Sequence, residues 1–231
     1  MKKINLPSEI IYLISIVVLA FSVAMLTAVD FGISMIVAPA YLLSVKLGFI
    51  TFGQAEYIIQ AVFFIIFCFL MGKFKPTFLV SFITCLLYGA VLDLFRLIPL
   101  FNPAVTPPGS MELWVKVLMF IGGVTLTAFS IALCFRTYLY PQVYDMFVNE
   151  VSKKFKVKTS KFKFIFDMAF LVIGVVLSFI FFGTLIGIYW GTLIMALING
   201  PYIGFMGNMI DKLIEIKPLF PKFAKSFEIE K

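Results

Sequence analysis

The sequence repeats the same order of elements twice, and this repeat constrains the fold more than any other feature. Residues 10–95 and 114–210 each carry an apolar span, a polar hinge, an amphipathic piece, a second span, a glycine-containing break and a third span. Three crossings are an odd number, so the second copy must run opposite to the first. Two inverted copies around a midplane site are typical of secondary transporters. We therefore expect an all-α membrane protein with two inverted three-helix repeats.

Composition places the chain among integral membrane proteins. It is 62% hydrophobic and 13% charged, whereas soluble domains are about a quarter charged. The 231 residues suffice for a single membrane domain, with residues 211–231 as a basic tail. Histidine is absent, and Cys68, Cys85 and Cys134 lie far apart in apolar spans. With no nucleophile–base pair, metal cluster or phosphate loop in the sequence, we expect no enzyme, cofactor or metal.

Six stretches are long enough to cross the bilayer, for which about 20 apolar residues are needed. They are Ile10–Val29, Ala55–Met71, Thr77–Ile98, Trp114–Phe135, Phe164–Phe182 and Ile186–Ile210. The first stretch resembles a signal peptide because two lysines precede it. Its counterpart in the second copy favours retention as a span.

The distribution of basic residues predicts the orientation. With both ends cytoplasmic, the cytoplasmic segments hold 16 of the 19 basic residues, and only Lys46, Arg96 and Lys116 lie outside. The 16 are Lys2, Lys3, Lys73, Lys75, Arg136, Lys153, Lys154, Lys156, Lys158, Lys161, Lys163, Lys212, Lys217, Lys222, Lys225 and Lys231. This bias follows the positive-inside rule and explains the net charge of +7 without a nucleic acid. Trp114 and Trp190 fall at the expected outer interface.

Two linkers do not fit a simple bundle. Residues 31–48 are too apolar for a solvated loop and too interrupted to span. Residues 141–155 form an amphipathic helix opening with proline, since its apolar residues recur every four positions. Each linker could lie in the membrane interface or re-enter the membrane where protein or water covers it. The sequence leaves both arrangements open.

Alignment of the two copies brings polar residues to equivalent positions. The aligned pairs are Asp30 with Arg136, Glu56 with Lys163, Gln60 with Asp167, Tyr88 with Asn199 and Gly89 with Gly200. Two pairs carry an acid in the first copy and a base in the second. Either the positive-inside rule or a shared binding site explains this exchange.

Carboxylates inside spans are the main candidates for function because a charge in the bilayer is costly and needs a partner or an aqueous cavity. Glu56 lies near the start of the second span, Asp93 is three residues before Arg96, and Asp167 is in the fifth span. Asp93 could pair with Arg96 within one helix. The candidate substrate-binding or ion-coupling residues are Asp30, Gln54, Glu56, Gln60, Asp93, Arg136, Asp145, Asp167 and Asn199.

Small residues and one proline mark further positions. Ala20, Ala24 and Ala28 recur every four residues, which is typical of close helix packing. The break Asn199-Gly200-Pro201 removes a backbone donor in the sixth span. We expect it to open or kink that helix, exposing polar backbone groups to a site.

The segments Asp30-Phe-Gly-Ile-Ser-Met-Ile-Val-Ala-Pro-Ala-Tyr, Gly53-Gln-Ala-Glu56-Tyr and Pro141-Gln-Val-Tyr-Asp-Met-Phe resemble bacterial integral membrane proteins of the YczE/YyaS/YitT type. Ala196-Leu-Ile-Asn-Gly200-Pro extends the resemblance, which covers residues 10–210. That family is largely uncharacterised. The resemblance implies a multi-pass protein of the bacterial inner membrane and supplies no substrate or catalytic residue.

Three functions remain open. The leading hypothesis is a permease-like transporter that moves a small solute by rocking one repeat against the other. A second is a solute-binding subunit that contacts an energy-coupling partner through the face of Ala20, Ala24 and Ala28. A third is an accessory membrane protein without a ligand. The expected partners are the lipid bilayer and a small solute, while a homo-oligomer or a membrane partner stays open.

Overall fold

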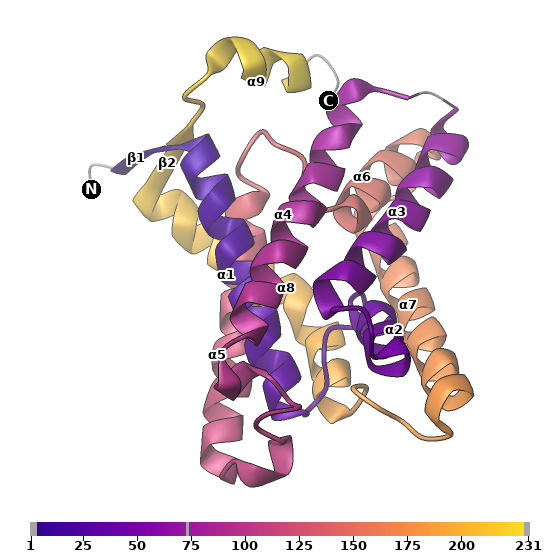
Figure 1. Cartoon of the computed structure of the whole chain (residues 1–231). Helices are drawn as coiled ribbons and strands as arrows, with labels where there is room; N and C mark the ends of the chain where they lie inside the picture. Colours follow the sequence, from indigo (N-terminus) through magenta and orange to yellow (C-terminus); the bar gives the residue numbers. More distant parts are fainter. Residues whose placement is uncertain (1–3, 73, 229–231) are drawn as a thin grey trace.

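Six long apolar helices dominate the computed structural model, which describes residues 4–72 and 74–228 (Figure 1). They are α1 (Ser8–Val29), α3 (Phe52–Met71), α4 (Leu79–Arg96), α5 (Leu113–Cys134), α7 (Thr159–Phe182) and α8 (Trp190–Leu213). Each is long and apolar enough to cross a membrane, α4 together with the preceding η1 turn. The expectation of a multi-pass helical protein is thus confirmed. Of the predicted cytoplasmic charges, Lys2, Lys3, Lys73 and Lys231 lie outside the described residues.

Shorter elements connect and flank these helices. They are β1 (Ile4–Pro7), α2 (Ala38–Leu47), η1 (Pro76–Phe78), η2 (Pro99–Phe101), η3 (Pro108–Ser110), α6 (Val143–Lys154), β2 (Ile214–Lys217) and α9 (Pro221–Glu228). The strands are the one departure from the all-α prediction among the described residues. They are short and pair only with each other.

Local sequence signals set the helix boundaries. α3 begins three residues before the predicted Ala55 because Thr51 and Gln54 form a capping box, in which each side chain accepts the other's backbone N–H. α8 begins at Trp190 instead of the predicted Ile186. The reason is Gly187, whose φ of +69° lies in the left-handed region and holds the preceding segment outside the helix.

α1 and α5 form the centre of the molecule. Ala20, Ala24 and Ala28 are 0% exposed, and α5 packs closely along α1. Ser22 Oγ lies 3.0 Å from Thr127 Oγ1, a hydrogen bond between the two helices. The small-residue face proposed to dock a partner subunit is therefore occupied by this chain's own helices, which corrects that expectation.

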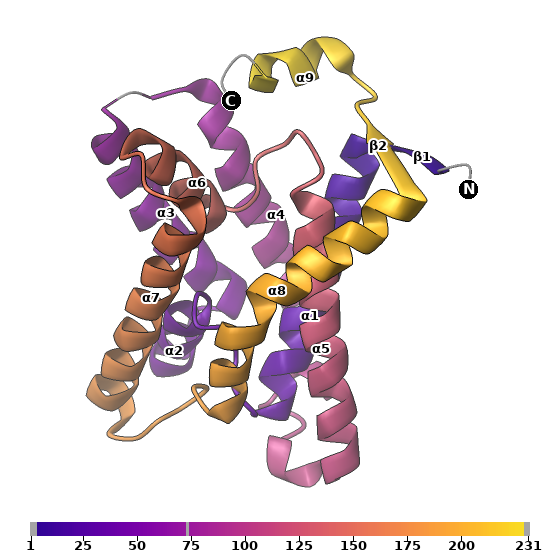
Figure 2. The same ribbon diagram turned by 180° about the vertical axis from the view of Figure 1, so that it is seen from behind.

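The other helices surround this pair in two groups. α4 packs against α1, and α8 packs against α5. α2 and α6 contact α3 and α7 in a second group, and α3 also packs against α4. Figure 2 shows α7 and α8 standing apart, and over the described residues they do not pack along their lengths. The same view shows α8 bending along its course, as expected for a helix with Pro201 inside it.

Both irregular linkers contain a short helix covered by protein. The buried residues of α2 include Ala38, Tyr41 and Leu42. In α6, Val143, Phe147 and Val151 are buried as the four-residue periodicity predicted, whereas Phe155 beyond the helix is 55% exposed. Each linker thus lies between long helices instead of on the surface of the bundle.

The two ends of the described chain meet on one side of the molecule. β1 and β2 pair in parallel, with Ile4 opposite Ile214. The Glu9 carboxylate accepts hydrogen bonds from the backbone N–H groups of Leu219 and Phe220 at 2.9–3.1 Å. In α9, Phe223 stays half exposed, but Phe227 is 1% exposed and packs on Tyr138 and Tyr140. Part of the tail therefore folds onto the protein, not only toward a membrane surface.

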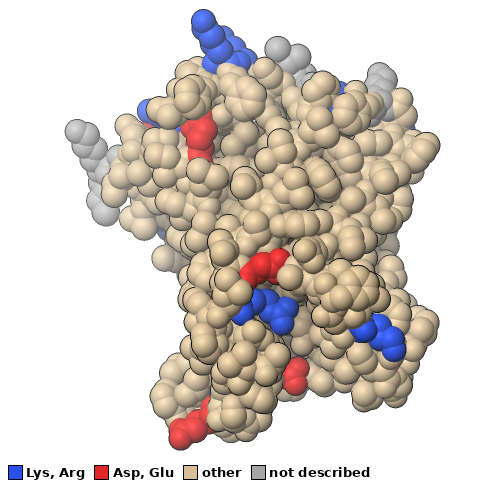
Figure 3. Space-filling model, viewed as in Figure 1, with Lys and Arg blue, Asp and Glu red and all other residues tan. Residues whose placement is uncertain are grey.

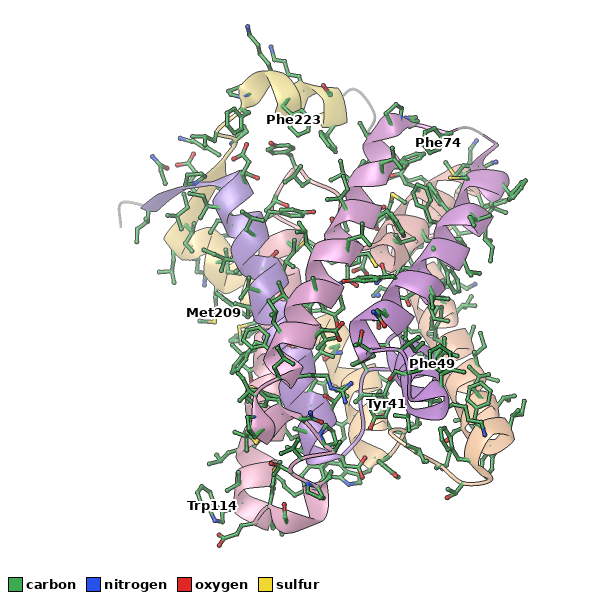
Figure 4. All side chains as sticks on the ribbon, in the orientation of Figure 1. Tyr41, Phe49, Phe74, Trp114, Met209 and Phe223 are labelled. Carbon is green, nitrogen blue, oxygen red and sulfur yellow. The ribbon has the colours of Figure 1, made fainter. Side chains whose placement is uncertain are left out.

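The surface matches a membrane-embedded body. On the face in Figure 3, a broad band without Lys, Arg, Asp or Glu separates charges near the α9 end from charges toward the opposite end. Trp114 lies at that opposite end, while Phe74 and Phe223 lie near the α9 end (Figure 4). Aromatic residues at both ends of an apolar band are typical of membrane–water interfaces.

A substitution in the α3–α4 contact tests this packing. A Cβ added at Gly53 would lie 2.5 Å from Asp93 Oδ2 and closer still to the backbone of Gly89. We expect Gly53→Ala to destabilise the protein by about 1–3 kcal/mol through overpacking. Thermal unfolding in detergent measures the effect.

Gly204→Ala is the matched control, because the added Cβ at this helical position meets nothing within 4 Å. Removing a helical glycine there should be neutral or stabilise by about 0.5–1 kcal/mol. Equal destabilisation by both substitutions would contradict the close α3–α4 contact.

Candidate functional site

Glu56 lies at the centre of a buried polar cluster. Its side chain is 0% exposed, and its Oε2 accepts hydrogen bonds from Gln60 Nε2 at 3.0 Å and Tyr144 Oη at 3.4 Å. Its other oxygen, Oε1, has no hydrogen-bond partner among the described residues. A buried carboxyl with one unsatisfied oxygen is unusual in a structural role. Such a group is available to a proton, an ion or a ligand.

Gln60 connects this carboxyl to the linker helix α6. Its amide nitrogen donates to Gln142 Oε1 at 3.1 Å as well as to Glu56. Its oxygen accepts from the backbone N–H of Val143 at 3.2 Å, in the first turn of α6. Gln60 therefore satisfies one of the free N–H groups at the start of that helix. The network joins α3 to the linker between α5 and α7.

A cavity of about 370 Å³ lies on the other side of the α6 start, between α7 and α8. Its lining comes from α5, α6, α7, α8 and the segment before α2, and it includes Ser34, Met35, Ile36, Thr127, Ile131, Asp145, Lys163, Phe164, Asp167, Met195, Ala196, Leu197, Asn199, Gly200, Pro201 and Ile203. We call it the α7–α8 pocket. Its volume lies within the usual range for small-molecule sites, about 300–1,000 Å³.

Charged groups form one wall of the α7–α8 pocket. Lys163 Nζ lies 3.3 Å from Asp145 Oδ1 and 3.5 Å from Asp167 Oδ1. Beyond that ion pair, Asp167 Oδ1 makes no hydrogen bond, and Asn199 Oδ1 is buried without a partner in the described structure. The structure thus brings three predicted candidates, Asp145, Asp167 and Asn199, into one pocket that also contains Lys163.

The glutamate cluster and the pocket are neighbours. Gln142 and Asp145 both line a cavity of about 20 Å³, together with residues of α1, α4 and α5. Such a cavity is large enough for one water molecule. Asp145 also lines the α7–α8 pocket. The start of α6 therefore contacts both sites, through Gln142 and Val143 on one side and Asp145 on the other.

Two candidates have structural roles at the start of α3. Gln54 is exposed and belongs to the capping box of α3, so the structure does not bring it to Glu56. Asp93 accepts from Thr51 Oγ1 at 2.5 Å and from the Gly53 backbone N–H at 2.9 Å. Arg96, its predicted partner, lies over the ring of Phe52 and interacts electrostatically with the Asp93 carboxylate. Asp93 fastens α4 to the start of α3.

Asp30 and Arg136 occupy the ends of α1 and α5. Asp30 is the C-cap of α1, with a φ of 55° in the left-handed region, and its carboxylate interacts electrostatically with Lys116. Arg136 donates two hydrogen bonds of 2.6 Å to the carboxylate of Asp211, and one of 2.9 Å to the Ala132 carbonyl. Neither lines the α7–α8 pocket or bonds to Glu56.

Sequence reasoning did not select Gln142, Tyr144 or Lys163 as site residues. Lys163 was visible only as the repeat partner of Glu56. Gln142 and Tyr144 belong to the linker predicted as an amphipathic helix, and the periodicity itself assigned Val143 and Phe147, not Tyr144, to its apolar face. Among the described residues, no group of three or more His, Cys, Asp or Glu side chains is arranged to hold a metal ion.

The sequence model described as Family of unknown function (DUF6198) matches residues 6–208, which is most of the chain. No curated protein and no solved structure shows a significant match.

The environment of Asp30 predicts that the stability of the folded protein depends on pH. Burial raises the pKa of its carboxyl above the ordinary value of 3.8, and Lys116 opposes part of that shift. The neutral carboxyl is therefore favoured in the folded protein, and its contribution to the free energy of unfolding is fully present below the ordinary pKa. That contribution is lost as pH rises through the higher pKa of the folded state. Tyr41 and Tyr189, also coupled to Asp30, titrate at alkaline pH.

Asp30→Asn removes this loss, because asparagine stays neutral and tolerates the left-handed backbone. We expect the melting temperature of the variant, relative to the unmodified protein, to increase from acidic to neutral pH. Detergent-solubilised samples in a pH series measure the difference. A difference that is constant with pH would contradict the assigned burial effect.

Proposed function

The chain belongs to that family of unknown function, and we propose that it is a secondary transporter for a small solute, built from two inverted repeats. In this proposal α1–α4 form one repeat and α5–α8 the other, with the site near the midplane between them. Both ends face the cytoplasm of a bacterial cell, in keeping with the charge bias. The YczE/YyaS/YitT resemblance is part of the same proposal.

The pattern of helix contacts supports the repeat. Under exchange of the copies, α1 corresponds to α5, α2 to α6, α3 to α7 and α4 to α8. The α1–α4 contact then has its counterpart in α5–α8, and the α2–α7 contact in α3–α6. The α1–α5 contact maps onto itself. Such an exchange is what a two-fold axis in the membrane plane produces.

Hydrogen bonds of the linkers follow the same exchange. Thr192 Oγ1 on α8 donates to the Ile33 carbonyl at 2.8 Å, in the linker of the first copy. Thr84 Oγ1 on α4 lies 3.1 Å from the Tyr140 carbonyl, in the linker of the second copy. The last span of each copy thus holds the linker of the other. Non-helical backbone inside a membrane protein needs such partners.

One contact breaks the symmetry, and it carries the proposal. α3 and α4 pack in direct contact, with Gly53 against Gly89, and Asp93 of α4 accepts a hydrogen bond from the Gly53 N–H at the start of α3. Their counterparts α7 and α8 are separated by the α7–α8 pocket. A repeat protein with one half closed and the other open has the geometry of one state in alternating access. Exchange of the two arrangements would move the opening across the membrane.

Unsatisfied polar atoms occur in both halves, and one pair of them is equivalent in the repeat alignment. The closed half contains Tyr88 Oη and Glu56 Oε1, and the open half contains Asn199 Oδ1 and Asp167 Oδ1, all buried without hydrogen-bond partners in the described structure. Tyr88 and Asn199 are repeat partners in the sequence alignment. We assign Glu56 the role of proton carrier, because a buried carboxyl can exchange its proton when the closed half opens.

The arrangement favours a transporter over a partner-dependent subunit. The face of Ala20, Ala24 and Ala28 is buried within the chain, which removes the feature that suggested a docked partner. The exposed residues of α7 and α8 include many large apolar ones, such as Val172, Ile180 and Leu193. That surface suits lipid contact.

The inverted topology predicts opposite labelling of two positions. Lys46 near the end of α2 and Lys154 at the end of α6 are both exposed. In a background without the three native cysteines, Lys46→Cys should react with an impermeant thiol reagent from outside, and Lys154→Cys only after the reagent reaches the cytoplasmic side. Intact and permeabilised cells separate the two cases. Labelling of both positions from one side would contradict the topology.

Uptake by the purified protein tests transport directly. Sealed liposomes that contain the chain alone are incubated with a bacterial metabolite extract under an imposed pH gradient, and retained solutes are identified by mass spectrometry. We expect enrichment with the unmodified protein and at least a tenfold loss with Glu56→Gln, which keeps the side-chain volume and removes the charge.

Matched reconstitution levels and unchanged unfolding temperature of Glu56→Gln control for folding. Equal enrichment by both proteins at every pH gradient would remove Glu56 as proton carrier. No enrichment in sealed, correctly loaded vesicles would favour an accessory role over transport.

A further inference from the structure

The charged side chains of the α7–α8 pocket include more carboxylates than ammonium groups. Its side chains supply two carboxylates, Asp145 and Asp167, against one ammonium, Lys163. That lysine already pairs with both carboxylates, at 3.3 and 3.5 Å. The three side chains together carry one net negative charge. The pocket therefore offers an uncompensated charge to a cation.

The uncharged polar groups point to the same chemistry. Asn199 Oδ1 is a buried acceptor without a donor in the described structure. Pro201 has no amide hydrogen, so it gives none to the carbonyl of Leu197 one turn earlier. Both residues line the pocket. Thr127, another lining residue, already bonds to Ser22. Asn199 Oδ1 and the Leu197 carbonyl are thus acceptors to which the N–H groups of a ligand would donate.

The remaining lining is apolar. It includes Met35, Ile36, Ile131, Met195 and Ile203, with the ring of Phe164 beside the charged wall. A bare metal ion would leave most of the 370 Å³ unfilled, and it would leave apolar walls in contact with water. An apolar body next to an ammonium group would satisfy both parts.

From these observations we propose that the α7–α8 pocket binds a small organic cation, a protonated amine attached to an apolar body. The ammonium donates to Asp167 Oδ1 and Asn199 Oδ1, and the body lies against Met35, Ile131 and Met195. This inference deepens the proposed function, on which it rests for the idea of a solute site, by giving the substrate class. Phe164 and Leu197, 58% and 74% exposed, lie at the rim, so an amphipathic amine could reach the pocket from the bilayer.

Four compounds that share a phenylethyl body and differ in charge test the class. They are 2-phenylethylamine, phenylalanine, 3-phenylpropionate and 2-phenylethanol. Binding to the purified protein in detergent is measured by isothermal titration. We expect the amine to bind at least tenfold more tightly than the acid or the alcohol, with the zwitterion between them. Equal or tighter binding of the acid, or no binding of the amine, would overturn the proposal.

Variants of the pocket change affinity in opposite directions. Asp167→Asn should weaken amine binding about tenfold or more, because it removes a charged acceptor. Lys163→Gln should strengthen it severalfold, because it leaves both carboxylates unpaired. Misfolding would weaken both, so the opposite signs exclude that explanation. Glu112→Gln is the charge-matched control, since Glu112 is exposed and bonds to Trp114 away from the pocket. Weakening by the control equal to that of Asp167→Asn would also overturn the proposal.

Binding and transport are separate readouts. Amine binding without uptake in liposomes would leave the cation site standing and remove the transport proposal. Uptake of some other solute without amine binding would keep transport and remove the cation site.

Discussion

The close contact of α1 with α5 is the interaction on which the remaining structure depends. Gly123 of α5 leaves room for Leu26 of α1, and Ser130 Oγ of α5 donates to the Ser15 carbonyl of α1 at 2.7 Å. Apolar side chains gain little by leaving lipid, so packing of small residues and the Ser22–Thr127 hydrogen bond hold the pair together. Such a bond contributes only about 0.6 kcal/mol on average. The stability of the centre therefore comes from the length of the contact.

Around this centre, irregular backbone is tolerated because the protein itself supplies its partners. Gly191 donates its N–H to the Phe31 carbonyl at 2.8 Å, and Ile33 donates to the Gly187 carbonyl at 3.0 Å. Gln60 does the same for the start of α6. Each linker is thus fixed by elements distant in sequence. Polar side chains near these linkers are consequently placed by tertiary contacts, and only weakly by their own helices.

This division explains what the sequence could predict. The six spans follow from hydropathy, and boundaries within a few residues follow from caps such as Thr51 and breaks such as Gly187. The repeat alignment singled out Asp167 and Asn199 but not Asp145, which lines the same pocket. The contribution of Gln142 and Tyr144 could not be predicted, because it depends on how α6 is inserted beside α3. The spacing of Thr51 and Gln54 is a capping-box signature that sequence reasoning did not use. The contact of Asp93 with the start of α3 could not be predicted, because it depends on the approach of α4.

The parallel pairing of β1 with β2 fixes the order in which the molecule can be completed. β1 precedes the first span and β2 follows the last, so during synthesis the β1 backbone stays without its partner until every span has been made. The Glu9 carboxylate likewise lacks its donors, the backbone N–H groups of Leu219 and Phe220, until those residues have been made. A nascent chain released before residue 214 therefore retains an unpaired strand edge. Such an edge is a mark by which incomplete products differ from the finished protein.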